Sequence, residues 1–295
     1  MKKQLAGILA LLLMLIQTVI GMIPLMTIAL LKLIVPIKSF RRSCTIAVMR
    51  IAETWAEVNK GIFALLTSTQ WEVNCDIPLR KDTSYLIVCN HQSWVDIPAL
   101  IQVLNRKVPF YKFFLKQELI WVPLLGLAWW ALDYPFMKRY SKEQIARKPS
   151  LAGKDMEITR KACEKFRGLP VSVINFAEGT RFRQEKHDHQ NSPYDQLLRP
   201  KAGGIAFALE SLGTQLDAIL DVTIVYPDGI PTFWDLMTNR IRRVVVDIQQ
   251  IDIQPEWLTG GYQTNPEYRE RFQQWVSDLW HEKDARIKHL QSAIN

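Results

Sequence analysis

With 295 residues, the chain is long enough for one large domain or two small ones around a sizeable core. Its formal net charge of +8 at pH 7 favours a negatively charged partner: a membrane surface, a nucleic acid or a phosphorylated substrate. The 10 tryptophans are many for this length, and tryptophan is enriched at the headgroup level of bilayers. The 4 cysteines lack CxxC or CxH spacing, which excludes a disulfide frame and a zinc site and favours free thiols in a reducing compartment.

An uncharged, apolar segment occupies residues 4–31, near the start of the chain. It is longer than the roughly 20 residues that cross a bilayer as a helix, and a basic cluster at 32–42 follows it in place of a small-x-small cleavage site. Membrane attachment is therefore favoured over a signal peptide, with the remainder of the chain on the cytoplasmic side. Gly21 and Pro24 leave two geometries open: one kinked helix that crosses, or a helical hairpin that enters and leaves on one side.

Two further apolar segments favour the membrane surface or a packed interface. Residues 44–69 carry apolar side chains at helical spacing, which predicts an amphipathic helix that lies on the membrane or packs on the next domain. Residues 119–132 are uncharged but too few to cross a bilayer, so a buried or interfacial segment is expected there. We therefore divide the chain into membrane-anchoring and amphipathic helices at 1–70 and a second domain at 71–295.

The stretch from Tyr85 to Asp96 combines a predicted strand with polar groups at its end. Residues 85–89 are apolar and rich in β-branched side chains, as in a buried strand. Ser93 is then expected to begin a helix as its N-cap, with Asp96 three residues later in a capping box. A strand-to-helix corner brings His91 against Asp96, and a carboxylate that holds one imidazole nitrogen leaves the other free to take a proton. The competing interpretation is that Asp96 only caps the helix and His91 is a hydrogen-bonded corner residue.

Strands and helices alternate through the rest of the chain, which predicts an α/β domain. Strands are predicted at 71–75, 171–177, 222–226 and 244–251, and helices at 97–104, 141–168, 201–212 and 266–294. The polar cluster 178–181 follows a strand, as His91 does, and ligands of α/β proteins bind at the carboxyl ends of strands. Residues 183–193 predict a polar loop, where His187 and His189 favour solvated side chains over a metal site because no further ligand is suitably spaced.

Four motifs in this order resemble those of the glycerolipid acyltransferases, over about residues 71–230. Asn90-His91-Gln92-Ser93-Trp94-Val95-Asp96 resembles the NHxxxxD motif of that family, and Glu178-Gly179-Thr180-Arg181 matches its EGTR motif. Phe136-Met137-Lys138-Arg139 resembles the second motif, and Val222-Thr223-Ile224-Val225-Tyr226-Pro227 resembles the fourth. Within the family, the chain is most similar to a bacterial branch of the lysophosphatidic acid acyltransferases.

The resemblance implies both a fold and an activity. The fold is α/β: a mixed, largely parallel sheet flanked by helices, as in glycerol-3-phosphate acyltransferase, with an N-terminal membrane helix or helical hairpin. The activity is transfer of a fatty acyl group from acyl-CoA or acyl carrier protein to the sn-2 hydroxyl of 1-acyl-glycerol-3-phosphate, with no cofactor, no metal and no nucleic-acid partner. The catalytic domain would work among membrane phospholipids at the cytoplasmic face, which is that of the inner membrane in the bacterial branch.

His91 and Asp96 are the catalytic residues that the resemblance implies. His91 would take the proton from the acceptor hydroxyl as it attacks the thioester, and Asp96 would hold the imidazole, so no acyl-enzyme is needed. Transfer to another lysophospholipid is an open alternative. So are a membrane lipid-binding or scaffold protein without turnover and a lipid hydrolase in which His91 activates water.

A second group of residues is implied to bind the lysophospholipid acceptor. Its basic members would fix the phosphate, and contact with lipid headgroups or solvent is the alternative for those outside the EGTR motif. Glu178 is expected to orient Arg181 or a backbone amide, and Gly179 to permit a close backbone approach. The full set is Lys116, Arg139, Glu178, Gly179, Thr180 and Arg181.

Overall fold

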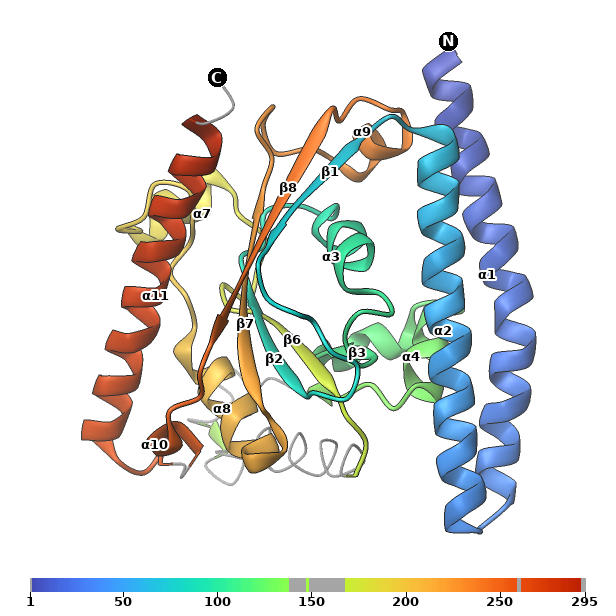
Figure 1. The fold of residues 1–295 in the computed structure, drawn as a ribbon, viewed down its shortest axis with the longest axis horizontal. Coiled ribbons are helices and arrows are strands. Elements are labelled where there is room, and N and C mark those ends of the chain that lie inside the picture. The colour runs from blue at the N-terminus through green and yellow to red at the C-terminus, as the bar shows by residue number, and fades with distance from the viewer. Residues whose placement is uncertain (1, 138–146, 149–167, 259–260, 293–295) are drawn as a thin grey trace.

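A six-stranded sheet forms the centre of the protein (Figure 1). The structure is a computed structural model, and it describes residues 2–137, 147–148, 168–258 and 261–292. The strand order is β1-β8-β7-β2-β6-β3. These strands are β1 (Gln70–Cys75), β2 (Tyr85–Cys89), β3 (Tyr111–Phe113), β6 (Ser172–Phe176), β7 (Ala218–Val225) and β8 (Arg243–Ile251). A separate pair of short strands consists of β4 (Leu115–Lys116) and β5 (Phe136–Met137).

The sheet is mixed and largely parallel, which confirms the predicted fold class. Only the β7–β8 pair is antiparallel among the pairs in the described part of the sheet. In the centre, Cys89 of β2 lies across from Phe176 of β6 and Val222 of β7. Because these three strands are parallel, their carboxyl ends meet at the same edge, and the loops that follow them can form one site.

Helices cover both faces of the sheet (Figure 1). The helix α8 (Ala202–Leu212) and the long α11 (Pro266–Ser292) pack on one face, and α3 (Asp96–Leu104) packs on the other. The side chains of β2 alternate between the two cores, since Leu86 and Val88 join the first and Ile87 joins the second. A strand buried on both faces in this way reads as a continuous apolar run, as predicted for 85–89.

Two long antiparallel helices stand beside the α3 face (Figure 1). The first, α1 (Lys2–Ile34), is continuous through Pro24, so the apolar segment does not itself fold into a hairpin. The hairpin forms instead between α1 and α2 (Lys38–Leu66), which begins six residues before the predicted start at 44. An ion pair between Lys32 and Asp133 connects α1 to the domain behind it.

Most apolar side chains of α1 are exposed, and α1 is long and apolar enough to cross a membrane; no other helix in the described residues is. The segment 119–132 continues this exposed apolar surface through the 3₁₀ helix η1 (Gln117–Trp121) and α4 (Leu125–Ala131), which contacts α1. Its Trp121 is 85% exposed, as expected of an interfacial segment rather than a buried one.

Charges on the exposed face of α1 test its membrane contact. Lysines at Ile16, Ile20 and Ile23 should release the protein from neutral phosphatidylcholine vesicles, because each charge in the apolar layer costs about 2.5–3.5 kcal/mol. Vesicle sedimentation measures the bound fraction. Lysines at the exposed Glu267 and Glu270 of α11 serve as the control and should leave sedimentation unchanged. Undiminished sedimentation of the α1 variant would show that the attachment lies elsewhere.

Most differences from the predicted secondary structure lie in short elements, but the long strand β7 begins at Ala218, four residues before the predicted start at 222. The strands β3, β4 and β5 have two or three residues each, too few to produce a periodic pattern. Residues 184–190, predicted as loop, form the helix α7 (Gln184–Gln190), in which Gln184 Nε2 donates to Asp188 Oδ1 over 2.7 Å. The predicted helix at 141–168 lies almost wholly outside the described residues. Within the described residues there are three more short helices: η3 (Gly213–Gln215), α9 (Phe233–Met237) and α10 (Pro255–Leu258).

Candidate active site

The candidate site begins with Asn90, which joins the end of β2 to β7. Its side-chain Nδ2 donates to the carbonyl of Ile224 over 2.9 Å, and its Oδ1 accepts from the Ile224 amide over 2.8 Å. The Asn90 side chain thus makes the two hydrogen bonds to β7 that a backbone residue of β2 would make if the strand continued. Because both bonds are buried, they fix the direction in which the backbone leaves the strand toward His91.

His91 and Asp96 are in direct contact. His91 Nδ1 lies 2.7 Å from Asp96 Oδ2, and the Asp96 carboxylate is fully buried. The same oxygen accepts from the backbone amides of Gln92 and Ser93 over 2.8 and 2.9 Å. A buried carboxylate with these donors holds Nδ1 as the protonated nitrogen, which leaves Nε2 as the acceptor. The His91 side chain is 17% exposed, so the ring remains accessible to a reacting group.

The predicted capping box is wrong in detail. Helix α3 begins at Asp96 and its N-cap is Val95, not Ser93. The Ser93 hydroxyl instead accepts from the Val95 amide over 3.0 Å and donates to the Pro231 carbonyl over 2.6 Å. The carboxylate that was expected to cap the helix therefore spans the turn before it and holds the imidazole as well.

Aromatic rings fix the plane of the His91 imidazole. The ring of Phe176, the last residue of β6, stacks on it with centroids 4.0 Å apart and planes 19° from parallel. Phe113 stacks on the other side of Phe176 at 5.9 Å. The imidazole is thus held by Asp96 at one edge and by a ring on one face, which limits its rotation.

The EGTR loop wraps around the backbone of His91. Glu178 Oε1 accepts from the His91 amide over 3.0 Å, and its Oε2 accepts from the Leu198 amide over 3.2 Å. The Phe182 amide donates to the His91 carbonyl over 2.8 Å. Glu178 therefore orients backbone amides rather than Arg181. The backbone N–H and the backbone carbonyl of His91 are thus both bonded by Glu178 and Phe182, so the NHxxxxD motif and the EGTR loop form one structural unit.

Gly179 is required where it stands. Its φ of +69° lies in the left-handed region, and a Cβ atom there would lie 3.0 Å from Lys201 Nζ and 3.2 Å from Lys201 Cδ. The next residue, Thr180, accepts a hydrogen bond through its hydroxyl from Lys186 Nζ. Both sides of the tight turn are thus occupied by lysine side chains, and glycine is the residue that avoids strain in both respects.

Burial gives Glu178 an unusual titration. It raises the pKa of this carboxyl group from 4.5 to about 8, although the two amide donors act in the opposite direction. The folded protein therefore holds the proton more tightly than the unfolded chain. The contribution of protonated Glu178 to the free energy of unfolding is therefore fully present below pH 4.5 and is lost as the pH rises to about 8.

A Glu178→Gln variant tests this titration. Because glutamine does not ionise, the melting temperature of the wild type relative to the variant should fall between pH 4.5 and 8 and level off above that. Thermal melts of both proteins across this range measure the difference, in which the titrations of all other groups cancel. A constant difference would show that Glu178 keeps one charge state throughout.

Arg181 carries its charge beside the motif that contains His91. Its guanidinium lies 3.8 Å above the ring centroid of Trp94, which is 62% exposed. Burial lowers the pKa of Arg181, with the charge of Arg183 acting in the same direction, but arginine stays protonated in proteins. Stacking on Trp94 holds the guanidinium plane and leaves its edge for a bidentate contact with an anion.

The remaining predicted site residues are Lys116 and Arg139, the latter in the second motif. Lys116 is exposed on β4, and in the β4–β5 pair it lies across from Met137 of that motif. Arg139 itself lies outside the described residues, as does the Cys163 thiol.

No metal site is found among the described residues. They contain no group of three or more His, Cys, Asp or Glu side chains that could hold an ion. The His187 imidazole is hydrogen-bonded within the protein, since its Nε2 lies 2.6 Å from the carbonyl oxygen of Tyr194. Within the same residues, Cys44, Cys75 and Cys89 are free thiols.

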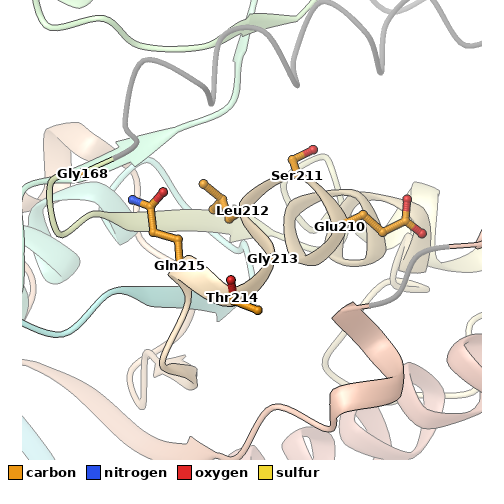
Figure 2. Close-up of a pocket in the computed structure, with 7 residues that line it drawn as sticks. All are labelled: Gly168, Glu210, Ser211, Leu212, Gly213, Thr214 and Gln215. Atoms are coloured by element: carbon orange, nitrogen blue, oxygen red, sulfur yellow. The ribbon is translucent and has the colours of Figure 1, made fainter.

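A hollow of about 410 Å³ lies at the opposite end of the sheet from His91. Figure 2 shows its lining at the end of α8, from Glu210 to Gln215, together with Gly168, which precedes β6. His91 and the EGTR motif follow the carboxyl ends of β2 and β6, so this hollow at the amino end is not part of the candidate site.

Three residues of the site were not predicted from the sequence as functional: Tyr226, Trp94 and Phe176. The Tyr226 hydroxyl donates to Asp96 Oδ1 over 2.5 Å, across 130 residues of sequence. Tyr226 and Trp94 both lie inside recognised motifs, and Phe176 directly precedes the EGTR motif. The available signal was that Phe176 and Tyr226 lie at strand ends and Trp94 lies in the turn after β2, but the contacts that these side chains make depend on tertiary structure.

The chain is similar in sequence to known acyltransferases. The chain is 24% identical to lysocardiolipin acyltransferase 1 of Gallus gallus, over 82% of this chain and 62% of that protein. It is 22% identical to 1-acyl-sn-glycerol-3-phosphate acyltransferase epsilon of Mus musculus, over 76% and 62%. The chain thus spans about three fifths of the length of these curated relatives.

The fold matches a solved structure over nearly its full length. The crystal structure of the 1-acyl-sn-glycerophosphate (LPA) acyltransferase PlsC from Thermotoga maritima aligns with a TM-score of 0.52 and 20% identity, over 94% of this chain and 97% of that one. The sequence model of the family described as Acyltransferase matches residues 71–227, more than half of the chain. This match begins at β1, ends just after β7 and includes the His91–Asp96 pair and the EGTR loop, so the chain belongs to the acyltransferase family.

Proposed function

We propose that the protein transfers a fatty acyl group from acyl-CoA or acyl carrier protein to the sn-2 hydroxyl of 1-acyl-glycerol-3-phosphate, which gives phosphatidic acid. The observation that carries the proposal is the 2.7 Å contact between His91 Nδ1 and the buried Asp96 carboxylate, in a ring that stays partly exposed. A scaffold protein would need neither this contact nor the EGTR loop that holds it.

His91 acts as the general base in this reaction. Its Nε2 takes the proton of the acceptor hydroxyl, and the hydroxyl oxygen forms a bond to the thioester carbonyl carbon. When the carbon–sulfur bond breaks, the leaving thiolate takes a proton from the imidazolium, so His91 is restored. Asp96 stabilises the imidazolium between the two steps, and such a base contributes about 10²–10⁴ in rate.

Arg181 binds the phosphate of the acceptor, with help from the basic residues of the second motif. The guanidinium stacked on Trp94 presents its edge beside the His91 loop. A charge-assisted hydrogen bond of this kind contributes roughly 1.5–3 kcal/mol. Binding the phosphate there brings the free sn-2 hydroxyl of the acceptor close to His91.

The membrane places the lipid substrates within reach of this site. The exposed apolar surface of α1 contacts the acyl chains, and the basic residues that follow it contact anionic headgroups. We assign the catalytic domain to the cytoplasmic face, where the basic cluster at 32–42 would remain. The lysophospholipid acceptor then reaches His91 by lateral diffusion, without leaving the bilayer.

A second acceptor is favoured by the relatives. Lysocardiolipin acyltransferase 1 is a relative whose match covers 82% of this chain, so another lysophospholipid is the alternative acceptor. One labelled acyl-CoA offered with a panel of lyso-acceptors, followed by separation of the lipids, distinguishes the two. Label in phosphatidic acid supports the proposed acceptor, and label in another phospholipid replaces it.

Thiol release distinguishes transfer from hydrolysis. A transferase should release free CoA from acyl-CoA only when a lyso-acceptor is present, in equal amount to the lipid product. Release without acceptor, together with free fatty acid, would identify a hydrolase and contradict the proposal. No release with any acceptor would leave a lipid-binding protein without turnover.

A further inference from the structure

The fourth motif contributes a side chain to the His91–Asp96 pair. Asp96 Oδ2 is occupied by His91 and two backbone amides, and its other oxygen, Oδ1, accepts from the Tyr226 hydroxyl over 2.5 Å. Tyr226 directly follows β7 and is 3% exposed. The apolar core around the ring therefore leaves Asp96 as the partner of its hydroxyl.

The loop after β7 holds Tyr226 in this position. The Gly229 amide donates to the Tyr226 carbonyl over 3.1 Å, which closes a turn. Further along, the Pro231 carbonyl accepts from the Ser93 hydroxyl over 2.6 Å, so the loop is tied to the NHxxxxD motif at a second point. These contacts make the tyrosine part of the catalytic corner rather than an ordinary core residue.

We propose that Tyr226 is a positioning residue for catalysis, whose hydroxyl fixes the Asp96 carboxylate and moderates its pull on the His91 proton. The inference rests on the proposed function, because it assumes that neutral His91 is the base. A hydrogen bond to a carboxylate stabilises its charge and lowers its proton affinity. Without this bond, Asp96 would hold the imidazolium more tightly, and His91 would give up its proton less readily.

The tyrosine is suited to a constant donor role. Burial raises the pKa of Tyr226 well above its usual value, and the charge of Asp96 acts in the same direction, so the hydroxyl stays protonated. Other titratable groups interact with Asp96 from β2 and the EGTR loop, namely Cys89, Glu178 and Arg181, while Lys283 of α11 acts on Cys89 and Glu178. A change confined to the Tyr226 hydroxyl leaves all of these in place.

A Tyr226→Phe variant removes the hydroxyl and keeps the ring. Its profile of kcat/KM against pH should have an acid limb about half to one pH unit higher than that of the wild type, since His91 then binds its proton more tightly. The matched control is Tyr85→Phe, which removes another buried hydroxyl, one that accepts from the Arg80 amide over 3.2 Å. The control should keep the wild-type acid limb even if its activity changes.

A second variant keeps the proposal testable if Tyr226→Phe is unstable. Incorporation of 3-fluorotyrosine at position 226 makes the hydroxyl a stronger donor, so the acid limb should move to lower pH. An acid limb that neither variant moves, or one that Tyr85→Phe moves equally, would overturn the role of Tyr226 alone. A wild-type profile without any acid limb would instead overturn the assignment of His91 as base.

Discussion

An Asp96→Asn variant should lose about 10²–10⁴ of its rate of acyl transfer, which is what a positioned base contributes. Asparagine matches the shape of aspartate but carries no charge to stabilise the imidazolium. Its amide group can also donate to Nδ1, which would place the His91 proton on Nε2, the nitrogen that must accept. The loss should appear in kcat, because Asp96 is buried and does not contact either substrate.

Asp235→Asn is the matched control for this substitution. Asp235 also accepts a backbone amide at the start of a helix, since its carboxylate bonds the Thr232 amide over 2.9 Å at the N-terminus of α9. Loss of the Asp235 cap costs about 1 kcal/mol of stability, and the Asp235→Asn variant should keep the wild-type rate of acyl transfer. A fully active, folded Asp96→Asn protein would exclude the carboxylate from the mechanism.

Removal of the Arg181 guanidinium should weaken acceptor binding. In Arg181→Ala, KM for 1-acyl-glycerol-3-phosphate should rise by about 10- to 100-fold, which corresponds to the roughly 1.5–3 kcal/mol of a charge-assisted hydrogen bond. KM for the thioester should change little. Initial rates at varied concentrations of each substrate separate the two effects.

Two controls sharpen the test of Arg181. Arg183→Ala removes an exposed arginine two residues away, so it lowers the local positive charge without touching the guanidinium stacked on Trp94. It should raise the acceptor KM far less. Arg181→Lys keeps the charge but loses the planar fork, and it should fall between the two. If all three variants bound the acceptor equally, the phosphate would have to bind elsewhere.

The fold was predictable where local pattern and burial agree. The strands β2, β6 and β8 are each rich in apolar residues that are buried on one or both faces of the sheet. Their predicted bounds are correct to within one residue. The strand pair β4–β5 and the helix α7 were not predicted. Elements of two to seven residues are too short for a periodic pattern, and whether they form depends on the tertiary contacts that they make. The order of the strands in the sheet also depends on long-range pairing that periodicity does not report.

The site was predictable in part for a similar reason. The sequence places His91 and Asp96 five residues apart at a strand end, so a corner brings them together, and the structure has them in contact. Glu178 and Tyr226 come from 87 and 130 residues away, and no local rule joins them to this corner. The helix start at Ser93 was wrong because the Ser93 hydroxyl accepts from the Val95 amide, two residues on, in place of the Asp96 amide, although Asp96 does accept from the Ser93 amide as in a capping box.

The central claim is that His91 activates the hydroxyl of a membrane lysophospholipid. Its most direct test measures how fast purified His91→Ala and wild-type proteins form labelled phosphatidic acid in lipid vesicles. The comparison requires that the two proteins bind the vesicles equally and have the same thermal stability. We predict that the variant loses about 10²–10⁴ of the wild-type rate, as expected when a positioned base is removed. Phosphatidic acid formed by the folded variant at the wild-type rate would contradict the account.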